Sequence, residues 1–190
     1  MVSGLGGGGH RWVVRTMEQH DLRAERAISE YRGHINAYCR RRLPLDLAVE
    51  ASSETIAVTW RRRDVLPDEP ETLPWMYGVA RKVVKTVRRS EQRWIARGER
   101  ARGIHDSGGT GVEDSMIRAD EERQVRQALS RLRQSDQEIL RLAAWEGLSN
   151  GQIAELLHLT QAATDQRLSR AKHRLADEYN RLNDRKGGTR

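Results

Sequence analysis

Side chains that can form hydrogen bonds to nucleic-acid bases and phosphates are concentrated in a short segment near the carboxyl end of the chain. Glutamine and arginine can each form two hydrogen bonds to one base edge, whereas lysine and serine can hold a backbone phosphate. Thr164, Leu168 and Ala171 recur among them at helical spacing, which predicts a helix with one buried face. We predict that its polar face contacts DNA through Gln161, Asp165, Gln166, Arg167, Ser169, Arg170, Lys172 and His173.

The residues before this segment predict two shorter helices that would position it. Ser135 and Glu138 have the spacing of a capping box, in which each side chain binds a backbone N–H of the first turn. Ser149 and Gln152 repeat that spacing. Gly147 lies between the two helices, where a left-handed residue would end the first of them.

A tight turn separates the second short helix from the polar helix. It contains only His158 and Leu159, and Thr160 is expected to cap the helix that follows. A short helix, a tight turn and a longer polar helix form the helix-turn-helix that reads a major groove, with Trp145 expected in the core behind it. The alternative is an ordinary helical hairpin whose polar face is only solvated.

Three short motifs in this region have the order and spacing of a known family. They are Glu146-Gly147-Leu148-Ser149, Gln152-Ile153-Ala154-Glu155 and Arg167-Leu168-Ser169-Arg170-Ala171. With them, residues 129–175 resemble the fourth conserved region of the extracytoplasmic-function sigma factors, the smallest members of the sigma-70 family. The resemblance implies that this region binds the upstream promoter element, the −35 element.

The start of the polar helix departs from the family pattern. Ala163, Thr164 and Asp165 stand where the family usually has Thr, Val and Lys. An anion near DNA phosphates is unfavourable unless it accepts a hydrogen bond from a cytosine amino group or pairs with a neighbouring arginine. Asp165 therefore predicts an unusual upstream element.

A second basic helix is expected from Trp75 to Arg97. Residues 73–89 resemble the family segment that opens and reads the −10 element, with agreement at Trp75 and Ala80 and with Lys82 replacing the usual Asn. Trp75 is interpreted as a core residue, and the alternative is a platform for a stacked base. The resemblance implies −10 contacts by Arg81, Lys82, Lys85, Arg88 and Arg89.

A third segment of the family precedes that helix. Residues 46–62 resemble the helix that docks on the clamp of core RNA polymerase, with direct matches at Glu54, Thr55 and Trp60. One acid and the usual Gln are missing from this chain. The implied polymerase-binding residues are Glu50, Ser53, Glu54, Ile56 and Ala57.

Hydrophobic periodicity predicts an all-α fold of two small domains joined by a flexible linker. In the first domain we expect helices over residues 21–42, 47–62 and 75–97, with Leu22 beginning the first buried stripe and an ordered, proline-rich loop from Asp64 to Pro74. The expected divisions are a disordered extension over 1–20, sigma region 2 over 21–97, a linker over 98–120, sigma region 4 over 121–182 and a disordered tail over 183–190. Met17 is an alternative start of the chain.

Composition limits the class of protein further. In 190 residues, 34 Lys and Arg outnumber 27 Asp and Glu, and the net charge of +7 favours a polyanionic partner. An arginine-rich protein from a GC-rich genome is the alternative explanation. Cys39 is the only cysteine, which excludes a disulfide within one chain, and no apolar run is long enough to cross a membrane. We therefore expect a cytoplasmic, nucleoid-associated protein.

The resemblance of these segments together implies an extracytoplasmic-function sigma factor. Its expected partners are core RNA polymerase, through the beta′ clamp and the beta flap, promoter DNA and an anti-sigma factor. The alternative is an autonomous helix-turn-helix regulator, for which dimers are expected. We expect no enzyme, cofactor or metal site, because the 6 histidines are scattered and lack an accompanying nucleophile or phosphate loop. His34 and Cys39 are interpreted as core residues rather than metal ligands.

Overall fold

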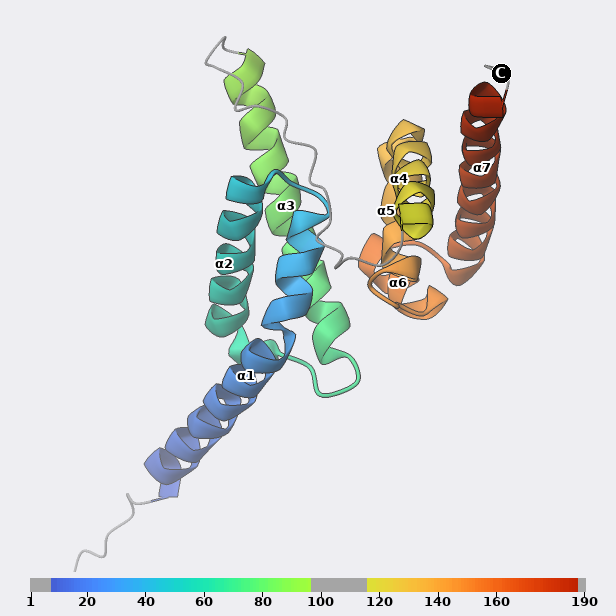
Figure 1. The fold of residues 1–190 in the computed structure, drawn as a ribbon. Coiled ribbons are helices and arrows are strands. Elements are labelled where there is room, and N and C mark those ends of the chain that lie inside the picture. Colours follow the sequence, from blue (N-terminus) through green and yellow to red (C-terminus); the bar gives the residue numbers. More distant parts are fainter. Residues whose placement is uncertain (1–7, 97–115, 188–190) are drawn as a thin grey trace, which may run out of the picture. The chain divides into compact units, whose positions relative to one another are not determined.

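The computed structural model describes residues 8–96 and 116–187, and this part of the chain is helical without any strand. The chain divides into two compact units between Gly109 and Thr110. The first unit contains α1 to α3 and the second contains α4 to α7 (Figure 1). The prediction of an all-α fold with two domains is confirmed. No helix in the described ranges has the length and apolar character needed to cross a membrane.

The first unit is a bundle in which each α-helix packs against the other two. Its elements are α1 (Gly8–Arg40), α2 (Leu45–Arg61), the short 3₁₀ helix η1 (Arg63–Val65) and α3 (Thr72–Ala96). Tyr38 of α1 and Tyr77 of α3 are stacked at its centre, with ring centroids 5.2 Å apart. The guanidinium of Arg42 lies 3.5 Å from the centroid of the Tyr38 ring.

Cys39 is also fully buried in this unit. Burial raises the pKa of its thiol from 9.0 to about 11, because a thiolate is poorly solvated in the protein interior. The thiol is therefore protonated at neutral pH and is a weak nucleophile. This agrees with its interpretation as a core residue, whereas the same interpretation of His34 is wrong, because His34 is exposed.

The connection from α2 to α3 is fixed to α1 by polar contacts. Arg23 pairs with Asp68 at 2.7 Å, and the Tyr31 hydroxyl donates to Oε1 of Glu69 at 3.0 Å. Burial and the hydrogen bond to Glu69 raise the pKa of Tyr31 to about 12. The loop is thus held in place by side chains of a neighbouring helix, as an ordered loop requires.

Two expectations about the helices of this unit are wrong. α3 begins at Thr72 rather than at Trp75, because proline is compatible with the first turn of a helix and Pro74 therefore does not delay its start. Leu22 is 64% exposed. The buried stripe of α1 passes through Ala24 instead, which is fully buried.

The second unit is built around its last helix. Its elements are α4 (Met116–Arg131), α5 (Gln134–Ala144), α6 (Asn150–Leu157) and α7 (Gln161–Gly187), and α7 packs against each of the other three. Trp145 is 43% exposed rather than part of the core, because it follows the last turn of α5 as its C-cap. The core consists mainly of Leu129, Ile139, Leu142, Ile153, Leu168 and Ala171.

Only one of the two predicted capping boxes is present. At the start of α6, the Ser149 side chain accepts from the backbone of Gln152, and the Gln152 side chain accepts from the backbone of Ser149. The box predicted at Ser135 is wrong, because α5 begins at Gln134 and the Arg133 carbonyl already accepts the first helical hydrogen bonds. That start of α5 has no side-chain cap.

The helices extend further than the predicted domain divisions. α1 begins at Gly8, inside the extension expected to be disordered, because the chain after its glycine run is rich in helix-forming residues and contains no proline. For the same reason α4 begins at Met116, inside the expected linker, and α7 continues to Gly187, inside the expected tail. The remainder of those segments, residues 1–7, 97–115 and 188–190, lies outside the described residues.

Candidate nucleic-acid interface

The first turns of α7 separate a buried stripe from a polar face. Thr164, Leu168 and Ala171 are buried against the rest of the second unit. The side chains predicted to contact DNA are all exposed, and we call them the α7 polar face: Gln161, Asp165, Gln166, Arg167, Ser169, Arg170, Lys172 and His173. The sequence period therefore assigned these residues to the correct side of the helix.

The turn before α7 is fixed by hydrogen bonds. His158 adopts a left-handed conformation with φ of 56°, and the Leu159 N–H donates to the Ala154 carbonyl at 2.9 Å. Thr160 caps α7, because its Oγ1 accepts from the Ala163 N–H at 3.1 Å. Together with the capping box of α6, these contacts fix the angle at which α7 leaves the turn, as a helix-turn-helix requires.

The basic residues of α3 divide into two groups. Lys82, Lys85 and Arg89 are exposed and available to phosphates. Arg81 and Arg88 are partly buried, and Nη2 of Arg88 donates to the Arg42 carbonyl at 2.7 Å. The structure therefore places Arg88 in the packing between α3 and the end of α1.

Trp75 is not a core residue, which corrects the preferred interpretation of the sequence. Its side chain is partly exposed at the start of α3, and the guanidinium of Arg62 lies 5.5 Å from its ring centroid. Such a distance permits a cation–π interaction. The indole is thus partly accessible beside a cationic side chain.

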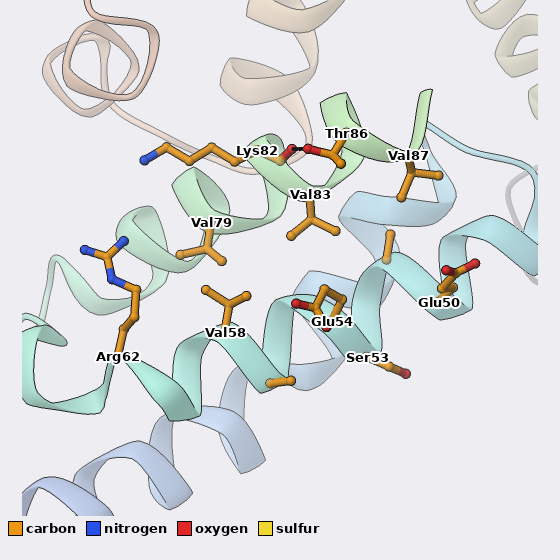
Figure 2. A pocket seen from close by; sticks show the side chains of 12 residues that line it. Glu50, Ser53, Glu54, Val58, Arg62, Val79, Lys82, Val83, Thr86 and Val87 are labelled. Atoms are coloured by element: carbon orange, nitrogen blue, oxygen red, sulfur yellow. Dashed lines mark hydrogen bonds between the residues drawn. The ribbon is translucent and has the colours of Figure 1, made fainter. Parts of the chain in front are cut away.

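A groove of about 700 Å³ lies between α2 and α3 (Figure 2). Val58 of α2 faces Val79 and Val83 of α3 within it, so its floor is apolar. Of the predicted polymerase-binding residues, Glu50, Ser53, Glu54 and Ala57 line this groove, whereas Ile56 does not. Lys82, which is predicted to contact DNA, lines the groove from α3. The groove is therefore lined by residues of both the predicted polymerase-binding site and the predicted DNA-binding site.

The second unit matches a described protein family. Residues 122–175 match the family model "Sigma-70, region 4", which includes α5, α6 and the polar face of α7. Over 182 residues the chain is 28% identical to the probable RNA polymerase sigma factor RfaY of Xanthomonas campestris pv. campestris. That alignment includes 89% of this chain but only 46% of the relative, so the chain spans less than half of its length.

Two solved structures share the fold. The sigma factor RpoE of Bartonella quintana, solved in complex with the anti-sigma factor NepR, matches 82% of this chain and 96% of that chain, with a TM-score of 0.65 and 16% identity. CnrH, solved in complex with the cytosolic domain of CnrY, matches 86% of this chain and 92% of that chain, with a TM-score of 0.57 and 16% identity. The second unit thus matches region 4 of the sigma-70 family, and the sequence as a whole is similar to that of a sigma factor.

Asp165, the residue that departs most from the family pattern, has a partner that the sequence did not indicate. Nδ2 of Asn150, the first residue of α6, donates to Oδ1 of Asp165 at 2.6 Å. Among the described residues Asp165 forms no ion pair, so the neighbouring arginine that the sequence allowed as a partner is not used. The hydrogen bond joins the two helices of the helix-turn-helix.

A second feature missed from the sequence is a hollow lined by arginines beside the polar face. It has a volume of about 320 Å³ and lies between the start of α5 and α7. Nη1 of Arg174 pairs there with Oδ2 of the buried Asp136 at 2.6 Å. Its basic residues are Arg133, Arg167, Arg170 and Arg174. Arg174 follows Arg170 by one helical turn, which is the signal that could have indicated it. No sequence pattern indicated Arg133, because it lies at the start of α5 and not on α7.

Among the described residues, no group of three His, Cys, Asp or Glu side chains is placed to hold a metal ion. The described residues do carry exposed hydrogen-bonding and basic side chains on two helices, α3 in the first unit and α7 in the second.

Proposed function

We propose that this chain is the promoter-specificity subunit of RNA polymerase. In the proposal, the first unit acts as sigma region 2 over residues 21–97 and the second as sigma region 4 over residues 121–182. The observation that carries it is the exposed polar face of α7 in a helix-turn-helix that matches sigma-70 region 4, in a chain that also carries the α2–α3 unit.

The second unit is proposed to bind the −35 element as duplex DNA. The α7 polar face enters the major groove, where its glutamine and arginine side chains contact base edges. The arginine hollow lies beside this face and suits a backbone phosphate, since four arginines line it and only one of them, Arg174, is paired with the buried Asp136 there. Phosphate contacts of this kind fix the register of the helix on the duplex.

The first unit is proposed to bind both polymerase and the opened −10 element. The α2 side of the groove, with Glu50, Ser53, Glu54 and Ala57, together with Ile56 outside the groove, docks on the beta′ clamp. The α3 residues Lys82, Lys85 and Arg89 hold phosphates of the opened strand, and Arg81 contributes from a partly buried position. The partly exposed Trp75 supports a stacking role for a base at the start of α3.

An anti-sigma factor is part of the proposal as well, because RpoE, which shares the fold, was solved in complex with the anti-sigma factor NepR. In this scheme the partner and core polymerase compete for the first unit. The protein acts at the nucleoid in the cytoplasm, and it contributes specificity rather than a catalytic group to transcription.

Run-off transcription with purified core polymerase tests this proposal. DNA fragments bound by polymerase and this chain together supply the templates. We expect promoter-specific transcripts only when the chain is added, and a loss of upstream-element selection in Arg170→Ala. Arg181→Ala is the matched control, because Arg181 also lies on α7 but outside the polar face. DNA binding without any chain-dependent transcript would instead identify an autonomous regulator.

A further inference from the structure

We infer that Asp165, held in place by Asn150, selects cytosine at one position of the −35 element. The inference rests on the proposed DNA-binding function of α7 and assigns a base preference to one of its side chains. Asp165 is exposed on the α7 polar face, one residue after the buried Thr164. It therefore lies where a recognition helix presents side chains to base edges.

The partner of Asp165 is itself fixed by the scaffold helix. Asn150 directly follows Ser149, whose reciprocal hydrogen bonds with Gln152 anchor the first turn of α6. The Asn150 amide then donates to Oδ1 of Asp165 at 2.6 Å. This bond restricts the carboxylate to fewer rotamers than an unsupported exposed aspartate would have. The carboxylate is thus oriented before DNA arrives.

The remaining hydrogen-bonding capacity of Asp165 determines which base it can contact. An ionised carboxylate only accepts hydrogen bonds, and its Oδ2 has no partner among the described residues. In the major groove, guanine and thymine present acceptors, which repel a carboxylate, whereas cytosine presents its N4 amino group. Adenine presents a donor next to the N7 acceptor, so one oxygen is attracted while the other is repelled. Cytosine is therefore the base that Asp165 accommodates best.

The same chemistry explains why an acid is tolerated on a DNA-binding face. Arg167 and Arg170 lie close along α7 and supply positive charge for phosphates, yet neither forms an ion pair with Asp165. The carboxylate consequently stays available for a base. A lysine at this position would contact a phosphate or a base that presents an acceptor. Asp165 instead favours a base that presents a donor.

The test is a selection from duplex DNA with a randomised upstream block, followed by sequencing of the bound fraction. It is carried out with the full-length chain plus core polymerase and, in parallel, with the chain alone. The variants are Asp165→Asn and Asn150→Ala, and melting curves check that both fold. Asp177→Asn and Asn180→Ala are matched controls, because they make the same changes at exposed positions further along α7.

We expect the unmodified chain to enrich cytosine at one position of the block. Asp165→Asn should shift that position to adenine, which an amide binds through both N6 and N7, with a loss of cytosine preference of roughly tenfold. Asn150→Ala should weaken the same preference by a few-fold without changing other positions, since it removes only the positioning bond. The two controls should reproduce the unmodified base frequencies.

Unchanged base frequencies in both Asp165→Asn and Asn150→Ala would overturn the inference, as would enrichment of another base at the affected position. Failure of the proposed function looks different. In that case the chain alone selects DNA, and adding the chain to polymerase produces no enrichment beyond polymerase by itself. The base preference can still be read in the chain-alone selection.

Discussion

The two units differ in how they divide their polar side chains between packing and contact. In the second unit, one face of α7 is buried and the α7 polar face is wholly exposed. In the first unit, basic residues of one helix serve both purposes, since Arg88 binds the Arg42 carbonyl while Lys82 and Lys85 are exposed. A count of basic residues therefore predicts exposed positive charge well in the first turns of α7 and less well in α3.

The cores of the two units also differ in the type of side chain that fills them. The first is built around the stacked Tyr38 and Tyr77 with a buried thiol, whereas the second is built from small and aliphatic side chains. If each unit is stabilised by its own core, a substitution in one should leave the other folded. The following predictions test this separation, beginning with the largest expected effect.

Tyr77→Ala is expected to destabilise the first unit by about 3–5 kcal/mol, because it removes a buried aromatic ring from a stacked pair. Hydrogen exchange measured by mass spectrometry on the full chain should show loss of protection in peptides of α1 to α3 only. Ile139→Ala is the mirror control, since Ile139 is buried in the second unit. Loss of protection in both units from either substitution would show that they fold as one.

Alkaline pH is expected to weaken the first unit selectively through Cys39. Its pKa is about 11 in the folded protein against 9.0 for an exposed thiol, so the folded state binds the proton more tightly. The free energy of unfolding is therefore unaffected by this group below about pH 9 and falls between about pH 9 and 11, by roughly 2–3 kcal/mol in total. Cys39→Ala should remove this decline.

Urea unfolding followed by tryptophan fluorescence measures the free energy of unfolding of the first unit at each pH, with and without Cys39. In a Trp145→Phe background the remaining tryptophans all precede residue 97, so the signal reports on the first unit. Equal pH dependence with and without Cys39 would contradict the burial of its thiol.

Arg174→Met is expected to destabilise the second unit by about 2 kcal/mol. The substitution leaves the carboxylate of Asp136 buried without its ionic partner, and the effect is smaller than for a fully buried pair because Arg174 is half-exposed. Arg181→Met is the control, since Arg181 pairs with Glu178 at the surface and should change stability by less than about 0.5 kcal/mol. Thermal unfolding of both variants gives the comparison, and equal effects would argue against a structural role for the Asp136 pair.

The features that could be predicted from the sequence depend on short-range signals. The capping box of α6, the left-handed Gly147 and the cap at Thr160 each involve residues within one turn of one another. They locate the helix-turn-helix, and the helical period then separates its buried and exposed faces. The same reasoning predicts the polar face of α7 without knowledge of any tertiary contact.

The features that escaped prediction depend on contacts between distant residues. Asn150 meets Asp165 across two helices, and Arg88 meets the carbonyl of Arg42 from another helix, so neither pair follows from helical spacing. Trp75 was assigned to the core by its type, but the chain places it at a helix start under Arg62. Helix ends at Gly8, Met116 and Gly187 were missed because their sequences carry no stop signal at the expected divisions.

The two serines that share one sequence signature provide the finest test of this distinction. Ser149→Ala should destabilise the second unit by about 1 kcal/mol, because its side chain accepts a backbone hydrogen bond at the start of α6. Ser135→Ala should change stability by only a few tenths of a kcal/mol, since α5 has already begun and has no side-chain cap. Thermal unfolding of the two variants measures both effects. Similar losses would mean that the signature alone, rather than the local backbone, determines whether a serine stabilises a helix.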